Sequence, residues 1–207
     1  MARLNVNPTR MELKKLKARL TTAVRGHKLL KDKSDEMVRR FSLIIKENKR
    51  LREEVEKELS ETLRQFSVAR SVTSSYRAET AFAMPSVAVK ADCRVKSVMG
   101  VEVPDIELIN EKRADGLPYA YSEITSEADY SVTKAAALLP KMIALARIEK
   151  TVRLLAVEIE RNKRRVNALE YVMIPQLEET IKYIKSKLDE NERAAVIRLM
   201  KVKNKAD

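Results

Sequence analysis

Apolar residues in the first part of the chain recur at alternating steps of three and four. This seam has thirteen positions, ten of them apolar: Leu13, Leu16, Leu20, Ala23, His27, Leu30, Ser34, Met37, Phe41, Ile44, Asn48, Leu51 and Val55. Such alternation keeps one stripe of a helix facing a partner helix and is typical of a coiled coil. We therefore predict a helix from about Thr9, where Thr9 and Glu12 can form a capping box, to about Thr80.

The last third of the chain repeats the pattern. Steps of three and four run from Leu145 to Met173, two steps of four follow to Ile181, and alternation then resumes. Two successive fours form a stutter, and Pro175 lies inside it. Because a proline within a helix removes one backbone hydrogen bond, we predict a second long helix with a kink near Pro175.

The two seams match each other if the helices pair in opposite directions. Before the stutter, paired residue numbers add to 210; beyond it, they add to 211. This register pairs Met37 with Met173 and Leu16 with Ala195, and it places Asn48 opposite Asn162. We hypothesise that the two asparagines set the register, as a buried polar pair can in a coiled coil. The alternatives are solvated asparagines beside the seam, or a register slipped by seven residues.

Residues 86–125 alternate with the period of a strand. Apolar positions from Val87 to Val95 lead to a turn at Met99-Gly100 and a return strand to Ile109, and the apolar phase flips at Pro104, which suggests a bulge or an edge strand. We read residues 110–117 as a loop. The predicted fold is mainly α: a long antiparallel two-helix coiled coil of residues 1–85 and 126–207, with a small β-hairpin and loop region at 86–125, as one elongated domain.

Charge adds a preference for acidic partners. The chain carries a net charge of +12, and the excess of Lys and Arg lies in residues 1–85 (20 against 11 Asp and Glu) and 126–207 (17 against 12). Such a balance attracts nucleic acid, anionic lipid or an acidic protein cavity. The 210 register brings two basic clusters to one level, which forms either a positive belt or an ordinary solvated face. The cluster residues are Lys46, Lys49, Arg50, Arg52, Arg161, Lys163, Arg164 and Arg165.

Candidate chemistry is sparse. No G-x-x-x-x-G-K-[ST] motif occurs, and His27, the only histidine, occupies a seam position. Cys93 is the only cysteine, which excludes an intrachain disulfide and favours a reducing compartment; its strand position predicts a buried, inert thiol. The first ten residues lack an apolar signal region, and no stretch is apolar enough to span a bilayer. We expect a soluble, cytoplasmic chain without catalytic residues, cofactor or metal site.

Three motifs carry a family resemblance. The sequences NVNPTRMEL at 5–13 and RGHKLLKDK at 25–33 resemble the N-terminal signature of the D subunit of V/A-type rotary ATPases, and RRVNALEY at 164–171, continuing through Ile174-Pro175 to ENER at 190–193, resembles its C-terminal signature. The resemblance implies a non-catalytic central shaft that transmits torque between the ATP-handling A/B hexamer and H+ or Na+ transport through the membrane rotor. It implies termini inside the hexamer, a hairpin region that binds the F subunit, a foot on a membrane-side rotor subunit, and no membrane insertion.

The resemblance and the charge pattern together nominate contact residues. For the hexamer we expect Lys46, Lys49, Arg50, Arg161, Arg164 and Arg165. For the F subunit we expect the hairpin and nearby tyrosines, namely Val87, Val89, Val101, Val103, Ile106, Tyr119 and Tyr121. The alternatives are a nucleic-acid-binding coiled coil, although no aromatic residues are interleaved with the basic clusters, and an adaptor or secretion-apparatus stalk.

Overall fold

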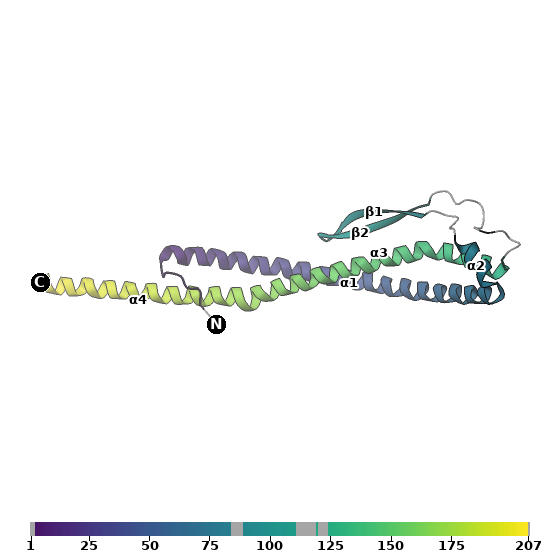
Figure 1. The fold of residues 1–207 in the computed structure, drawn as a ribbon. Helices are drawn as coiled ribbons and strands as arrows, with labels where there is room; N and C mark the ends of the chain where they lie inside the picture. The colour runs from purple at the N-terminus through teal and green to yellow at the C-terminus, as the bar shows by residue number, and fades with distance from the viewer. Residues whose placement is uncertain (1–2, 84–88, 111–118, 120–123, 207) are drawn as a thin grey trace. The chain divides into compact units, whose positions relative to one another are not determined.

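The computed structural model describes residues 3–83, 89–110, 119 and 124–206. The element order is α1 (Arg10–Val72), α2 (Ser75–Phe82), β1 (Val89–Val98), β2 (Val101–Asn110), α3 (Ser126–Ala168), η1 (Leu169–Met173) and α4 (Ile174–Ala206) (Figure 1). The predicted class, mainly α with long first and last helices and a small hairpin between them, is confirmed. Within the described ranges, no helix is both long and apolar enough to cross a membrane.

The chain divides into two compact units. The terminal unit combines residues 1–37 with 159–207, and the hairpin unit comprises residues 38–158. Each unit therefore contains a part of α1 and a part of the later helices, and the division cuts across the three segments read from the sequence. The two helical parts run antiparallel inside each unit, as the contacts below show.

An extended segment precedes α1 in the terminal unit. The backbone N–H of Leu4 donates to the Thr180 hydroxyl at 3.2 Å, and the Arg3 guanidinium lies 4.3 Å from the centre of the Tyr183 ring. At the start of α1, the backbone N–H of Glu12 donates to Thr9 Oγ1 at 3.2 Å. This hydrogen bond confirms the half of the capping box that Thr9 supplies.

The core of the terminal unit corrects the predicted register. Leu16, Ala23, Leu177 and Ile184 form one buried cluster, whereas Ala195, the expected partner of Leu16, is exposed. Side-chain bonds join Arg10 to Glu192 and His27 to Glu170. Paired numbers therefore add to about 200, and each expected partner is displaced by about three helical turns.

The predicted asparagine pairing is also corrected by this register. The side-chain amide of Asn162, which is 1% exposed, donates to the sulfur of Met37 at 3.3 Å. Met37 thus lies against Asn162 and not against Met173, eleven residues further along the chain. Asn48 belongs to the hairpin unit, where its side chain is half-buried. Because eleven residues span about three turns, both registers present the same helix face.

The sequence stutter coincides with a change of helix type. Leu169–Met173 form a π-helical turn, in which the backbone N–H of Ile174 donates to the carbonyl of Leu169. Pro175 follows immediately and has no N–H to donate to a carbonyl one turn earlier. Next to the position of the predicted kink, the structure therefore has a π turn, a wider turn that is often found near functional sites.

The first long helix ends earlier than the apolar pattern suggests. α1 ends at Val72, and after a two-residue interruption α2 begins at Ser75. Hydroxyl-bearing residues at 71 and 73–75 offer the backbone alternative hydrogen bonds, and the Ser71 hydroxyl donates to the Val68 carbonyl at 2.7 Å. The break lets Ala78 and Ala81 of α2 become buried, and Phe82 meets Phe66 edge to face at 5.5 Å.

The hairpin is confirmed. Met99 and Gly100 both have positive φ (55° and 82°), as a two-residue type I′ turn requires. The ten cross-strand pairs follow one another without interruption, and Val95 lies opposite Pro104. No bulge interrupts the paired strands at Pro104, and β2 is an edge strand of a two-stranded sheet, which is the other arrangement that the phase flip suggested.

Candidate partner-binding surfaces

The hairpin has one apolar face that points away from the chain. Cross-strand pairs share a face, so Ala91 and Leu108, Cys93 and Ile106, and Val95 and Pro104 lie together, with Val89 at the end. We call these seven residues the outer face. Val95 is 73% exposed, and Val89, Ala91 and Cys93 are also exposed. The prediction of a buried Cys93 is therefore wrong.

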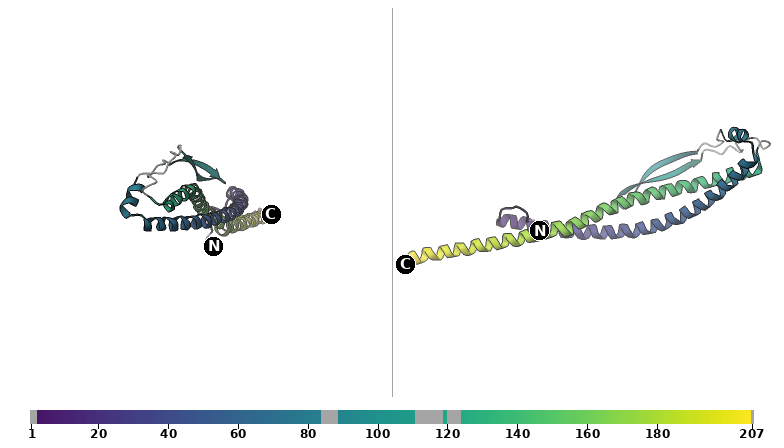
Figure 2. Two further views of the ribbon diagram at one scale, coloured as in Figure 1. Left: turned by 90° about the vertical axis from the view of Figure 1, so that its right-hand side faces the viewer. Right: turned by 60° about the horizontal axis from the view of Figure 1, so that its bottom comes forward.

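The opposite face of the hairpin packs against its own unit. Val103 on this face is 4% exposed, and Asp105 accepts a 2.7 Å hydrogen bond from Arg147 on α3. Figures 1 and 2 show the two strands alongside α3. The phase flip at Pro104 therefore sends Val101 and Val103 inward, on the face of Arg94 and Lys96, and leaves the more regular apolar row of β1 in solvent.

Tyr119 packs against residues of its own unit. Its ring meets Phe82 edge to face at 5.6 Å, its hydroxyl donates to Asp129 at 2.8 Å, and the residue is 9% exposed. Of the residues expected to contact the F subunit, Val103 and Tyr119 are thus buried inside the hairpin unit. Val89 is exposed and Val101 and Ile106 are partly so, whereas Val87 and Tyr121 lie outside the described residues.

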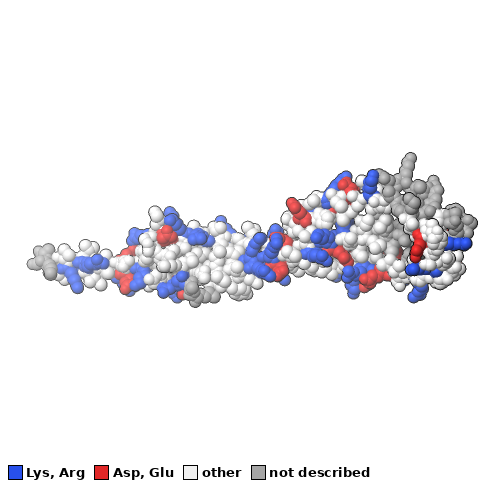
Figure 3. Space-filling view, in the orientation of Figure 1, with Lys and Arg blue, Asp and Glu red and all other residues white. Residues whose placement is uncertain are grey.

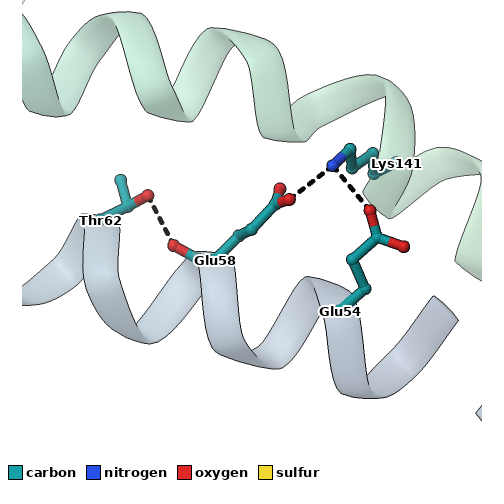
Figure 4. Close-up of polar contacts among 4 residues, drawn as sticks. All are labelled: Glu54, Glu58, Thr62 and Lys141. Atoms are coloured by element: carbon teal, nitrogen blue, oxygen red, sulfur yellow. Dashed lines mark hydrogen bonds and ion pairs between the residues drawn. The ribbon is translucent and has the colours of Figure 1, made fainter. Parts of the chain in front are cut away.

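An ion network joins the two helices of the hairpin unit. Lys141 of α3 contacts Glu54 at 2.9 Å and Glu58 at 2.5 Å, and the Thr62 hydroxyl donates to the Glu58 carbonyl (Figure 4). The hydrogen bond from Lys141 lowers the pKa of Glu54, and the bonds to Glu58 and then Glu54 raise the pKa of Lys141. Arg52 of α1 also reaches Glu149 of α3 at 2.8 Å. Together, these ion pairs favour one register between α1 and α3, because a shifted register would separate the opposite charges.

Sequence reasoning did not identify this network, although a signal was present. Glu54, Glu58 and Glu61 follow one another at steps of four and three, and Lys134 and Lys141 are seven apart on the other helix. Opposite charges at such flanking positions commonly select partner and orientation in coiled coils. A complementary-charge comparison of the two helices would have favoured the observed register.

The basic residues expected at the hexamer are exposed and are divided between the two units. Lys46, Lys49 and Arg50 belong to the hairpin unit, whereas Arg161, Arg164 and Arg165 belong to the terminal unit. Lys49 reaches Glu53 on its own helix at 3.8 Å, and Arg164 pairs with Glu160 in the same way. The corrected register removes the argument that placed both clusters at one level.

Positive charge nevertheless concentrates in the terminal unit. Its residues include 22 Lys and Arg against 12 Asp and Glu, whereas the hairpin unit has 20 against 18. On the face drawn in Figure 3, Lys and Arg side chains are prominent along the last part of α4. The terminal unit therefore presents a positive surface that favours an acidic partner.

The last turns of α4 add exposed apolar side chains that the sequence analysis passed over. They follow Glu192, the residue paired with the start of α1, and all are 49–69% exposed: Val196, Ile197, Leu199, Met200 and Val202. Apolar positions at nearly every step, instead of every three or four, were the available signal. Isolated exposed apolar residues are ordinary, but five within seven positions indicate a contact surface.

His27 is largely buried and contacts an acidic residue of the facing helix. Its ring nitrogen Nε2 lies 3.3 Å from the Glu170 carboxylate in the π turn, and the side chain is 19% exposed. Among the described residues, no group of three or more His, Cys, Asp or Glu side chains is placed to hold a metal ion.

Known proteins resemble the chain along nearly its whole length. The family model for the ATP synthase D subunit matches residues 12–204. A relative in Clostridium novyi (strain NT), the D subunit of a V-type ATP synthase, is 52% identical over 206 residues, covering 98% of this chain and 95% of that protein. Similar proteins with the same description occur in Thermoanaerobacter sp. (strain X514), at 50% identity over 203 residues (98% and 97%), and Clostridium botulinum (strain ATCC 19397 / Type A), at 51% over 205 (98% and 95%).

Proposed function

Because this chain belongs to the family of ATP synthase D subunits, we propose that it is the central-stalk subunit of a V/A-type rotary ATPase. In this role it transmits torque between an A/B hexamer that makes or hydrolyses ATP and a membrane rotor that moves H+ or Na+. The observation that carries the proposal is about 50% identity to named subunits over 98% of the chain. The chain itself supplies no catalytic group and works as a cytoplasmic, membrane-peripheral part of the complex.

Long paired helices suit a torque-bearing part. In the hairpin unit, ion pairs of Lys141 and Arg52 join α1 to α3. In the terminal unit, buried side chains such as Asn162 contact the facing helix. A packed helix pair resists twisting better than loops do, because side-chain interiors are close-packed and deform little. Shaft orientation then biases the open and closed states of each catalytic interface, and the interfaces bias the shaft in return.

The hexamer contact draws on the charge of the terminal unit. We assign it to exposed basic side chains, with Arg161, Arg164 and Arg165 in this unit and Lys46, Lys49 and Arg50 in the hairpin unit. Surface ion pairs are individually weak and screened by salt, so contacts of this kind can form and break as the shaft turns. The exposed apolar turns at the end of α4 extend the same interface.

The F subunit is assigned to the outer face of the hairpin. A two-stranded hairpin is marginal by itself, and this one leaves Val95 and its neighbours in solvent. Covering that face with a partner would stabilise the hairpin and remove apolar area from water. The assignment replaces Val103 and Tyr119 with Ala91, Cys93, Val95 and Leu108. A membrane-side rotor subunit receives the foot of the shaft.

Reconstitution tests the function. Purified A, B and F subunits are mixed with and without this chain, and ATP hydrolysis and rotation of an attached bead are measured. The expected result is a complex whose rotation requires the chain. Co-purification with nucleic acid, or with a membrane complex lacking A and B subunits, would instead support the nucleic-acid-binding or stalk alternative.

Matched variants test the two contact surfaces. Replacing Arg161, Arg164 and Arg165 by Gln is expected to weaken assembly with A and B. Gln at Lys57, Arg64 and Arg77 of the hairpin unit, which are also exposed, makes the same charge change without this effect. Val95→Asn is expected to weaken binding of the F partner. Its neighbour Lys96, on the inner face of the same strand, supplies the control Lys96→Asn. Equal effects within either pair of variants would contradict the corresponding surface.

A further inference from the structure

Gly26 is a glycine that its own chain does not require. It lies inside α1, where glycine is less favourable than alanine because it loses more backbone freedom on folding. A Cβ atom built on Gly26 meets no heavy atom within 4 Å, so close packing inside the terminal unit does not exclude a side chain. The residue also has ordinary helical structure, unlike Gly100 with its positive φ. No contact with the described residues of the terminal unit therefore accounts for glycine at this position.

The surroundings of Gly26 have the features of a contact surface. One turn earlier, Thr22 and Ala23 line an open groove of about 480 Å³ whose other wall includes Gln176 and Leu177. One turn later, Leu29 is 70% exposed. Residues three and four apart share a helix face, so the groove, the glycine and the exposed leucine follow one another along α1.

Charge identifies the chemistry of the partner. Between Glu12 and Asp32, α1 contains no acidic residue and seven basic ones: Lys14, Lys15, Lys17, Arg19, Arg25, Lys28 and Lys31. Arg19 lines the groove, and Arg25 and Lys28 are exposed on either side of Gly26. This stretch of α1 is uniformly basic, and its exposed cations are complementary to acidic residues on a protein partner.

We propose that an acidic segment of the catalytic hexamer crosses α1 at Gly26, closer than a side chain would permit. The absent Cβ leaves a notch for the partner's backbone, Leu29 supplies an apolar contact beside it, and Arg25 and Lys28 pair with carboxylates. The proposal rests on the proposed function, since it names the hexamer as the partner, and it adds the point of closest approach.

The experiment compares Gly26→Ala and Gly26→Leu with the wild type. In the isolated chain, Gly26→Ala is expected to raise Tm by about 2–4 °C, because alanine favours the helix and the side chain has free space. In assembly with A, B and F subunits, Gly26→Leu is expected to raise Kd by about fivefold or more, because overpacking a close contact is destabilising. The isolated Gly26→Leu chain is expected to keep a Tm at or above that of the wild type, because leucine also favours a helix over glycine, so its loss of assembly would not come from misfolding.

Two controls complete the test. Thr21 is exposed on the same helix, about 140° around from Gly26, so Thr21→Leu places the same leucine side chain on another face of α1 and is expected to leave Kd within about twofold. Arg25→Gln with Lys28→Gln is expected to raise Kd by about threefold or more, with the difference shrinking in high salt. If the wild type assembles and the Kd of Gly26→Leu is unchanged, the close approach at Gly26 is overturned. It is also overturned if Gly26→Leu and Thr21→Leu raise Kd equally. An unchanged Kd for the charge variant would overturn the acidic partner. Failure of the wild type to assemble would instead refute the proposed function.

Discussion

The contact between Met37 and Asn162 allows a quantitative test of the terminal unit. Both side chains are 1% exposed, and the Asn162 amide donates to the Met37 sulfur at 3.3 Å. A thioether is a weak acceptor, and burying an amide without a good partner costs about 1–3 kcal/mol in mutational data. The site therefore combines tight packing with a poorly compensated polar group.

Met37→Leu removes the acceptor and nearly preserves volume. The repacking costs less than about 1.5 kcal/mol, and the lost hydrogen bond adds about 1 kcal/mol, so we expect the free energy of unfolding to fall by about 1–2 kcal/mol. Asn162→Val removes the amide and is expected to raise the free energy of unfolding by about 1–2 kcal/mol. In the Asn162→Val background, Met37→Leu should cost about 1 kcal/mol less than in the wild type, because no amide is left without its acceptor.

Urea unfolding of the isolated chain, followed by helical circular dichroism, measures all four proteins of this cycle. Introduced cysteine pairs in a Cys93→Ser background report the register by disulfide formation. We expect Asn162→Val to admit additional registers, as the loss of a buried polar residue does in coiled coils. An equal cost of Met37→Leu in both backgrounds, within about 0.3 kcal/mol, would refute the coupling.

Four further predictions follow from single features. Lys141→Met is expected to make the loss of stability on acidification less steep. Because Lys141 lowers the pKa of Glu54, this carboxylate contributes to the stability of the fold above its ordinary pKa of 4.5, and the contribution is lost as pH falls through the pKa in the folded state. Midpoints of urea unfolding from pH 3 to 7 would show the difference. Ile184→Ala, at a fully buried position, should cost about 2–5 kcal/mol in urea unfolding, against less than about 0.5 kcal/mol for Val196→Ala, which is 49% exposed; similar costs would contradict the core. Met99→Asn should raise the free energy of opening of the hairpin by about 0.5–1 kcal/mol, because Met99 has a φ of 55° and asparagine tolerates this value better. Slower amide exchange in the hairpin would show the gain, and unchanged protection would count against the turn. Cys93 should react with a thiol reagent at nearly the same rate in native and urea-unfolded chain, because it is exposed; strong native protection would restore the buried assignment.

Local pattern determined the elements of this protein. Alternating steps of three and four predicted α1 and the later helices, Thr9 predicted the start of α1, and Met99-Gly100 predicted the turn, because each depends on neighbours within a few residues. Where several local preferences competed, as in the hydroxyl-rich residues at 71–75, the apolar pattern alone extended the helix too far. Family motifs at both ends, quoted from the same sequence, pointed to the family that the comparisons show.

Pairing between distant segments was decided only by the tertiary structure. A seam that repeats every seven residues, and nearly every eleven, presents the same face at several offsets, so periodicity could not choose between Met173 and Asn162 as the partner of Met37. Cross-helix ion pairs such as Lys141 with Glu54 distinguish the offsets, and they depend on which side chains meet. The hairpin shows the same limit: alternation defined its two faces, but only packing against α3 determined that Val103 is buried and Val95 is left in solvent.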